Sequence, residues 1–171
     1  AGIILDHHLY TGFAGTAGEA GHMIVQPGGR SCPCGNHGCL EQYISEPAVL
    51  SRYQELSGRT TVSIDDLVWS YNQKEADALA VVDEFTTYLA CGINNLWNLF
   101  SPECIILNSQ LTAYLPQLLP EILQKLSARF RATCQLKLST LQDTGVLLGA
   151  ARVCISKYLG IEKLYFSGFQ P

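Results

Sequence analysis

The clearest hydrophobic pattern in the chain lies between residues 75 and 100, where apolar residues recur at intervals of three or four. The repeating positions are Leu79, Val82, Phe85 or Thr86, Leu89, Ile93, Leu96 and Leu99. This period matches one face of an α-helix, so the segment predicts a long core helix, weakened only at Gly92. Ser101 and Pro102 follow it and predict its end.

Strand and helix patterns alternate after this helix. The pattern predicts a buried strand over 103–108, a helix over 118–130, a strand over 134–138 and a helix over 145–158. Such alternation is typical of α/β proteins, in which crossover helices join parallel strands. We therefore expect at least two parallel strands. Small residues around Gly149 predict that the last helix packs closely against a neighbour.

The first part of the chain carries shorter patterns. Ile3–Leu5 and Leu9–Tyr10 flank a polar turn and predict a β-hairpin. Residues 11–18 are rich in glycine and other small residues, which predicts a loop able to approach a ligand closely. His22–Val25 has the pattern of another strand.

Helix signals follow the cysteines. A short helix is predicted within Leu40–Ile44 and a second over Ala48–Leu56, with Ser45 as its N-cap and Gly58 as its stop. Ser63 opens a third helix. We expect the second and third of these helices to cover the cysteine loop.

Composition and charge narrow the class of protein. Of the 171 residues, 47% are hydrophobic and 15% are charged, which is typical of a globular chain with a substantial core. The formal net charge of −4 argues against a nucleic-acid or anionic membrane surface within this chain. No apolar run approaches the ~20 residues that cross a bilayer, so we expect no membrane insertion.

The cysteines form two groups. Cys91, Cys104, Cys134 and Cys154 stand singly in apolar segments and are predicted to be small core residues. Their placement, the odd total of seven and the lack of a signal peptide indicate a reducing compartment. We therefore expect a cytoplasmic protein.

The other three cysteines form the most informative motif. Cys32, Cys34 and Cys39 follow His22, and three thiolates with one imidazole complete the tetrahedral shell that structural zinc prefers. A closed shell leaves no position for a reactive water, so such a metal shapes the site without performing chemistry. Disulfides or free thiols are the alternative, although Cys32 and Cys34 are one residue apart and three cysteines cannot all pair locally.

Glycines and acidic residues surround this motif in a specific order. The elements are Gly18-Glu19-x-Gly21-His22, Gly29, Cys32-x-Cys34-Gly35-x-x-Gly38-Cys39-Leu40-Glu41, Asn95-Leu96-x-Asn98-Leu99-Phe100-x-Pro102-x-x-Ile105-Ile106-Leu107 and residues 145–151. They resemble the signature of the ROK family (repressors, open reading frames and kinases) over nearly the whole chain. The resemblance implies the actin-like, ribonuclease H-like sugar-kinase fold, with this chain as its second lobe and a zinc-stabilised loop within it.

The resemblance also implies the roles of individual residues. It implies zinc at His22, Cys32, Cys34 and Cys39, and sugar hydroxyls at Glu19, His22 and Glu41. Carboxylates accept hydrogen bonds from hydroxyls, and a histidine held by a metal points its second nitrogen in a fixed direction. Considered alone, Glu19 is a solvated loop carboxylate and Glu41 a first-turn helix residue. The full signature favours the binding roles.

Two classes of function fit the family. One is an ATP-dependent hexose kinase, and the other is a sugar-responsive transcriptional repressor. Family kinases have glycines near the nucleotide, which let the backbone approach it closely. At the same place this chain has Asn108-Ser109-Gln110, whose side chains would obstruct that approach. That variant looks more like the xylose and N-acetylglucosamine repressor branch. We therefore favour a repressor with no catalytic residue in this chain, and ATP is expected only under the kinase alternative.

The resemblance also suggests partners and an organisation for the chain. We expect a sugar or sugar phosphate, DNA bound through a domain N-terminal to this chain, and a homodimer or higher oligomer. Residues 1–46 are expected to hold the hairpin, sugar-site loop and zinc motif, 47–74 the helical cover, and 75–171 the α/β lobe. The chain opens within a strand pattern and without methionine, so we expect a fragment of a longer polypeptide.

Overall fold

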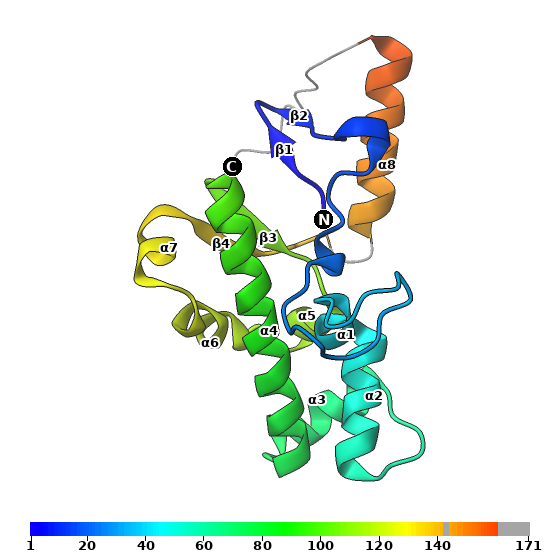
Figure 1. The fold of residues 1–171 in the computed structure, drawn as a ribbon, viewed down its shortest axis with the longest axis vertical. Helices are drawn as coiled ribbons and strands as arrows, with labels where there is room; N and C mark the ends of the chain where they lie inside the picture. Colours follow the sequence, from blue (N-terminus) through cyan, green and yellow to red (C-terminus); the bar gives the residue numbers. More distant parts are fainter. Residues whose placement is uncertain (142–143, 161–171) are drawn as a thin grey trace. The chain divides into compact units, whose positions relative to one another are not determined.

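The computed structural model of the chain describes residues 1–141 and 144–160 (Figure 1). It separates into two compact units. The first combines Ala1–Gly18 with the chain from Leu141 onward, and the second is Glu19–Thr140. The predicted boundaries near residues 46 and 74 stay a prediction. An irregular tail over 165–171 and a local cap at Asp143, both expected from the sequence, lie outside the described residues.

The first unit contains the predicted hairpin. Strand β1 (Ile4–Leu5) pairs antiparallel with β2 (His8–Leu9). The two turn residues, Asp6 and His7, have φ angles of 49° and 67°. Positive φ at both central residues matches the right-handed twist of the paired strands, so this turn closes a tight hairpin. A short 3₁₀ turn (Phe13–Gly15) follows within the glycine-rich loop.

The last helix of the first unit, α8 (Thr144–Leu159), confirms the helix prediction but not its packing. None of its described residues is buried. Val146 and Leu147 are 79% and 72% exposed, and a Cβ built on Gly149 meets no atom within 4 Å. The expectation of close packing is therefore wrong for the described residues. Small and apolar side chains permit close contact but do not require it.

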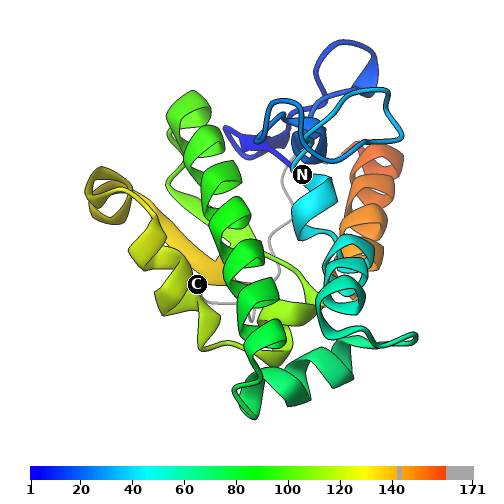
Figure 2. The ribbon, with the colours of Figure 1, turned by 60° about the horizontal axis from the view of Figure 1, so that its bottom comes forward.

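The second unit is built around the long helix α4 (Ala76–Phe100). Four helices pack against it: α1 (Glu41–Ile44), α2 (Glu46–Ser57), α3 (Ile64–Asn72) and α6 (Leu118–Lys125). Figures 1 and 2 show α4 running between α2 and α6. The sequence signals at the ends of the shorter helices are confirmed. The Ser45 side chain caps α2, Gly58 ends it in a left-handed conformation, and Ser63 opens α3 in a capping box.

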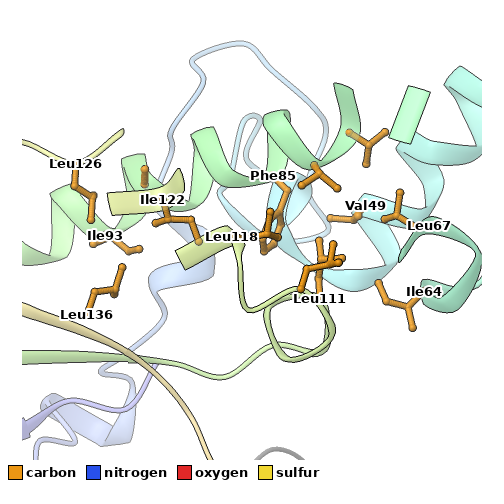
Figure 3. Packing of buried hydrophobic residues seen from close by; sticks show 14 of the residues in the cluster. Val49, Ile64, Leu67, Phe85, Ile93, Leu111, Leu118, Ile122, Leu126 and Leu136 are labelled. Carbon is orange, nitrogen blue, oxygen red and sulfur yellow. The ribbon is translucent and has the colours of Figure 1, made fainter. Parts of the chain in front are cut away.

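The core face of α4 agrees with the prediction at Val82, Phe85, Thr86 and Ile93 and departs from it at Leu79 and Leu99. Its most buried apolar residues are Ala78, Val81, Val82, Phe85, Ala90, Ile93 and Trp97. Leu79 and Leu99 are instead 40% and 72% exposed. The helix is apolar around much of its circumference, so several faces satisfy the same period. Phe85 and Ile93 contribute to one core with Leu118 and Ile122 of α6, as Figure 3 shows.

This register can be tested by substitution. We expect Phe85→Ala to lower the free energy of unfolding by about 3–5 kcal/mol, because it removes a large buried side chain and leaves a cavity. Leu79→Ala, on the exposed side of the same helix, should cost about 0.5 kcal/mol or less. Denaturant unfolding of both variants gives the comparison, and equal losses would contradict the observed register.

A two-stranded parallel sheet confirms the α/β prediction. Strand β3 (Cys104–Leu107) pairs with β4 (Gln135–Leu138), with Cys104 opposite Gln135 and Leu107 opposite Leu138. The connection carries α5 (Gln110–Tyr114), α6 and α7 (Ala128–Thr133). The expectation of a buried strand holds only in part, since Cys104, Ile105 and Leu107 are half-buried and Ile106 is 65% exposed. Only one face of this sheet is covered within the second unit.

The helix predicted over 118–130 is two helices. Leu126 has an extended ψ of 152° and ends α6. The Ser127 hydroxyl then accepts a hydrogen bond from the Phe130 N–H at 3.1 Å and opens α7. The apolar period continues through this break. Periodicity therefore does not reveal that Ser127 is an N-cap at which a new helix starts.

The isolated cysteines differ in burial. Cys134 is buried, as predicted, while Cys91 and Cys104 are half-buried. Cys154 is exposed on α8, so its prediction as a core residue is wrong. Within the described ranges, every helix is too short or too polar to cross a membrane.

Candidate metal centre

A tight loop over residues 26–39, here called the cysteine loop, brings the motif together. The Gly38 N–H donates to the Arg30 carbonyl at 2.7 Å, and Ser31 pairs with His37 in an isolated β-bridge. The Cys32 N–H donates to the Asn36 carbonyl at 2.9 Å. These bonds fold the loop back on itself and bring Cys32 close to Cys39, seven positions later in the sequence.

The segment before the loop is not the predicted strand. Ala20–His22 forms a 3₁₀ turn, and Ile24 makes only a single bridge, to Cys39. The turn forms because the His22 N–H donates to the Glu19 carbonyl at 3.0 Å. It places Glu19 and His22 on the same side of the cysteine loop, which a straight strand would not do.

His22, Cys32, Cys34 and Cys39 converge as the sequence predicted. Their ligand atoms all lie within 4.8 Å of one another. The Cys34 and Cys39 sulfurs are 3.6 Å apart, and the Cys32 sulfur is 3.7 Å from His22 Nδ1. Ligands on a tetrahedral zinc with Zn–S bonds of about 2.3 Å are separated by roughly 3.8 Å. The donor set and its spacing therefore fit a tetrahedral metal ion.

The thiols of this cluster differ in acidity. The Asn36 N–H and the neighbouring Cys32 lower the pKa of the exposed Cys34 thiol to about 7. Burial and, to a smaller extent, the neighbouring thiols together raise the pKa of the Cys39 thiol to about 12. A thiol must lose its proton to bind a metal. Without metal, Cys34 is thus the readier thiolate near neutral pH, while Cys39 requires the cation.

Two carboxylates flank the histidine. His22 Nε2 lies 3.8 Å from Glu19 Oε2, and His22 Nδ1 lies 3.9 Å from Glu41 Oε2. Both distances exceed hydrogen-bond length. Nδ1 is the nitrogen beside the Cys32 sulfur, so a metal held there would leave Nε2 free to face Glu19. The side chains of Glu19, His22 and Glu41 are 71%, 39% and 48% exposed, which leaves them open to a ligand.

Glycine is required at the closure of the loop. Gly38 has a φ of 82°, and a Cβ built there lies 1.7 Å from the Gln26 carbonyl oxygen. Gly35 also has a positive φ, 93°, but its Cβ would meet no atom within 4 Å. A side chain at Gly35 would therefore cause backbone strain alone, whereas one at Gly38 would cause the same strain and a steric clash.

We expect Gly38→Ala to open the cysteine loop and Gly35→Ala to leave it closed. Both variants bear the left-handed strain of about 1–2 kcal/mol, but only Gly38→Ala must also move the Gln26 backbone. Metal content after dialysis and the midpoint of thermal unfolding measure the difference. Equal metal retention in both variants would contradict this account of the loop.

Sequence reasoning missed the contacts that join the cysteine loop to α1 and α4. Arg30 contacts the backbone of α1 and the ring of Tyr43, and it pairs with Glu84 on α4. A charged residue between glycines and cysteines was visible in the sequence. Its partner 54 residues later carries no local signal.

Comparison with known proteins places these features in one family. The ROK family profile matches residues 1–157. The chain is 33% identical over 167 residues to the xylose repressor of Bacillus spizizenii, covering 95% of this chain and 43% of that protein. This chain therefore spans less than half of that relative.

Solved structures show the same fold. The ROK hexokinase of Thermus thermophilus matches with a TM-score of 0.75 and 25% identity, over 91% of this chain and 54% of its own. A ROK family transcriptional regulator, a homologue of the Escherichia coli MLC protein, matches with a TM-score of 0.72 and 29% identity, over 94% and 44%. These matches confirm the actin-like sugar-kinase fold. The chain belongs to the ROK family.

Proposed function

We propose that this chain is the effector-binding and dimerisation region of a sugar-responsive transcriptional repressor. The observation that carries this choice is the junction after β3. There the Ser109 hydroxyl accepts a hydrogen bond from the Thr112 N–H at 3.2 Å and caps α5. Glycines at this junction would let the backbone approach a nucleotide phosphate, whereas here a serine side chain occupies the position and caps the helix. The 33% identity to a xylose repressor supports the same choice.

The sugar site we propose lies beside the metal cluster. Glu19 and Glu41 accept hydrogen bonds from sugar hydroxyls, and His22 donates one from Nε2. His22, Cys32, Cys34 and Cys39 would hold zinc, which supplies no chemistry beyond fixing this loop, because its tetrahedral shell is closed. The half-exposed edge formed by Glu19, His22 and Glu41 supports this assignment.

In this proposal, sugar relieves repression by changing how much of the protein adopts each of its conformations. A sugar or sugar phosphate that binds one arrangement of the complete protein more tightly stabilises that arrangement. In a homodimer or higher oligomer, such a change alters the spacing of two DNA-binding heads, which we place N-terminal to this chain. A repressor of this kind works in the cytoplasm.

DNA release tests the proposal. The full-length protein should bind its operator tightly without sugar and weakly with one member of a panel of sugars and sugar phosphates. Fluorescence anisotropy of labelled operator DNA measures both states. Equal binding with and without every sugar of the panel would rule out the effector role.

The second candidate is an ATP-dependent hexose kinase of the same family. The fold shared with the Thermus thermophilus hexokinase favours it. We assign no catalytic residue within this chain, and under this candidate ATP would bind near the junction after β3. Incubation of the full-length protein with ATP and the same sugars decides the matter. ADP formation at ordinary enzyme rates that depends on sugar would overturn the repressor assignment.

A further inference from the structure

Arg30 links three parts of the second unit at one point. Its guanidinium donates to the Gln42 carbonyl of α1 at 2.8 Å and lies 4.6 Å from the centre of the Tyr43 ring. Its backbone N–H donates to the Tyr43 hydroxyl at 3.0 Å. The same guanidinium pairs with Glu84 of α4. Arg30 belongs to the cysteine loop, so this one residue joins that loop, α1 and α4.

The helix that presents Glu41 depends on such outside contacts. Helix α1 has a single turn, Glu41–Ile44, and a helix of that length is not stable by itself. Its last carbonyls lack partners within the helix, and an arginine side chain can satisfy them. Arg30 does so at Gln42, the residue after Glu41. Arg30 therefore contributes an outside contact to the single turn that carries Glu41.

Glu84 holds Arg30 in that position. Its carboxylate pairs with Arg30 through one oxygen and with Arg52 of α2 through the other, at 3.3 Å. The Glu84 side chain is 25% exposed, and those of Arg30 and Arg52 are 33% and 32% exposed. This shielding keeps the pairs stronger than fully exposed ones. One turn further along α4, Tyr88 stacks on Tyr43 with ring centres 4.0 Å apart, which gives α1 a second contact with α4.

We propose that Arg30 and Glu84 are positioning residues for the sugar site: they hold the single turn α1 so that Glu41 faces the ligand. Neither residue needs to touch the sugar. This inference rests on the proposed function, because it takes Glu41 as a sugar ligand.

The neighbouring residue Asp83 is a matched control. It lies on the same helix and pairs with Lys125 of α6 at 2.5 Å, away from the cysteine loop and α1. Asp83→Asn removes one charge and one ion pair from α4, whereas Glu84→Gln removes one charge and the pairs with both Arg30 and Arg52. Only Glu84→Gln disturbs the support of Glu41.

The test compares Glu84→Gln, Arg30→Met, their double variant and Asp83→Asn in the intact protein. Two measurements are made on each. Calorimetric titration with the sugar that binds the unmodified protein gives the dissociation constant. Amide hydrogen exchange of residues 40–45 reports the order of α1 without any sugar.

We expect Glu84→Gln to raise the sugar dissociation constant by about tenfold, the effect of losing a supporting residue behind a ligand. Exchange over residues 40–45 should become faster, while Asp83→Asn should leave both quantities unchanged. Because Arg30 and Glu84 act as one unit, the double variant should lose no more affinity than Arg30→Met alone.

The outcomes separate this inference from the function on which it rests. Unchanged exchange over residues 40–45 and unchanged affinity in Glu84→Gln overturn the positioning role, as do equal effects of Glu84→Gln and Asp83→Asn. Additive losses in the double variant also contradict it. If no sugar binds the unmodified protein, the proposed function fails first, and faster exchange in Glu84→Gln then limits the role of Glu84 to ordering α1.

Discussion

Replacing Cys34 with serine should remove the metal from this protein and lower its stability. A serine hydroxyl stays protonated near neutral pH and cannot complete the thiolate shell. Binding of structural zinc contributes directly to folding, with apparent free energies of about 10–16 kcal/mol in small zinc peptides. We therefore expect zinc content to fall from one ion per chain to none and the midpoint of thermal unfolding to drop sharply.

The control for this variant is Cys154→Ser. Cys34 and Cys154 are both exposed, but Cys154 lies on α8 and outside the metal cluster. The Cys154→Ser variant should keep its zinc and should unfold at the same midpoint temperature as the unmodified protein. Metal analysis by mass spectrometry measures the content of each variant. Unchanged zinc in Cys34→Ser would refute the ligand assignment, and equal loss in both would point to general destabilisation.

Replacing Glu41 with glutamine should weaken sugar binding by about 10–100-fold, since a hydrogen bond to a charged group contributes about 1.5–3 kcal/mol. Zinc content should stay at one ion per chain because Glu41 is not a member of the metal cluster. Calorimetric titration gives the affinity, and metal analysis of the same sample gives the zinc content.

Glu46→Gln separates this role from a simpler one. Glu41 and Glu46 are both exposed acidic residues in the first turn of a helix, α1 and α2 respectively. If Glu41 served only the helix dipole, the two variants would lose similar small amounts of stability and leave sugar affinity unchanged. We expect only Glu41→Gln to lose affinity. Equal affinities in both variants would remove Glu41 from the site.

Local chemistry made part of this structure predictable. The ends of α2 and α3 depend on single residues, Ser45, Gly58 and Ser63, whose preferences are strong. The metal cluster was predictable because its donors lie within eighteen positions of one another and their types are specific to a metal. The parallel sheet followed from alternation of strand and helix patterns.

What the sequence could not predict depends on distant contacts. Leu79 and Ala78 are equally compatible with an apolar period, and only packing against the neighbouring helices buries Ala78 and exposes Leu79. The exposure of Ile106 likewise depends on which elements cover the sheet. The pair of Arg30 and Glu84 joins positions 54 residues apart, so no spacing rule could identify it.

We propose that zinc and sugar bind to one site of this protein. The direct measurement is calorimetric titration of the intact protein with xylose, glucose, N-acetylglucosamine and their phosphates, before and after zinc removal. We predict saturable binding of at least one of them to the zinc-loaded protein, an affinity loss of about tenfold or more on zinc removal, and recovery when zinc is restored. Binding of none of these ligands, or equal affinity with and without zinc, would contradict the account.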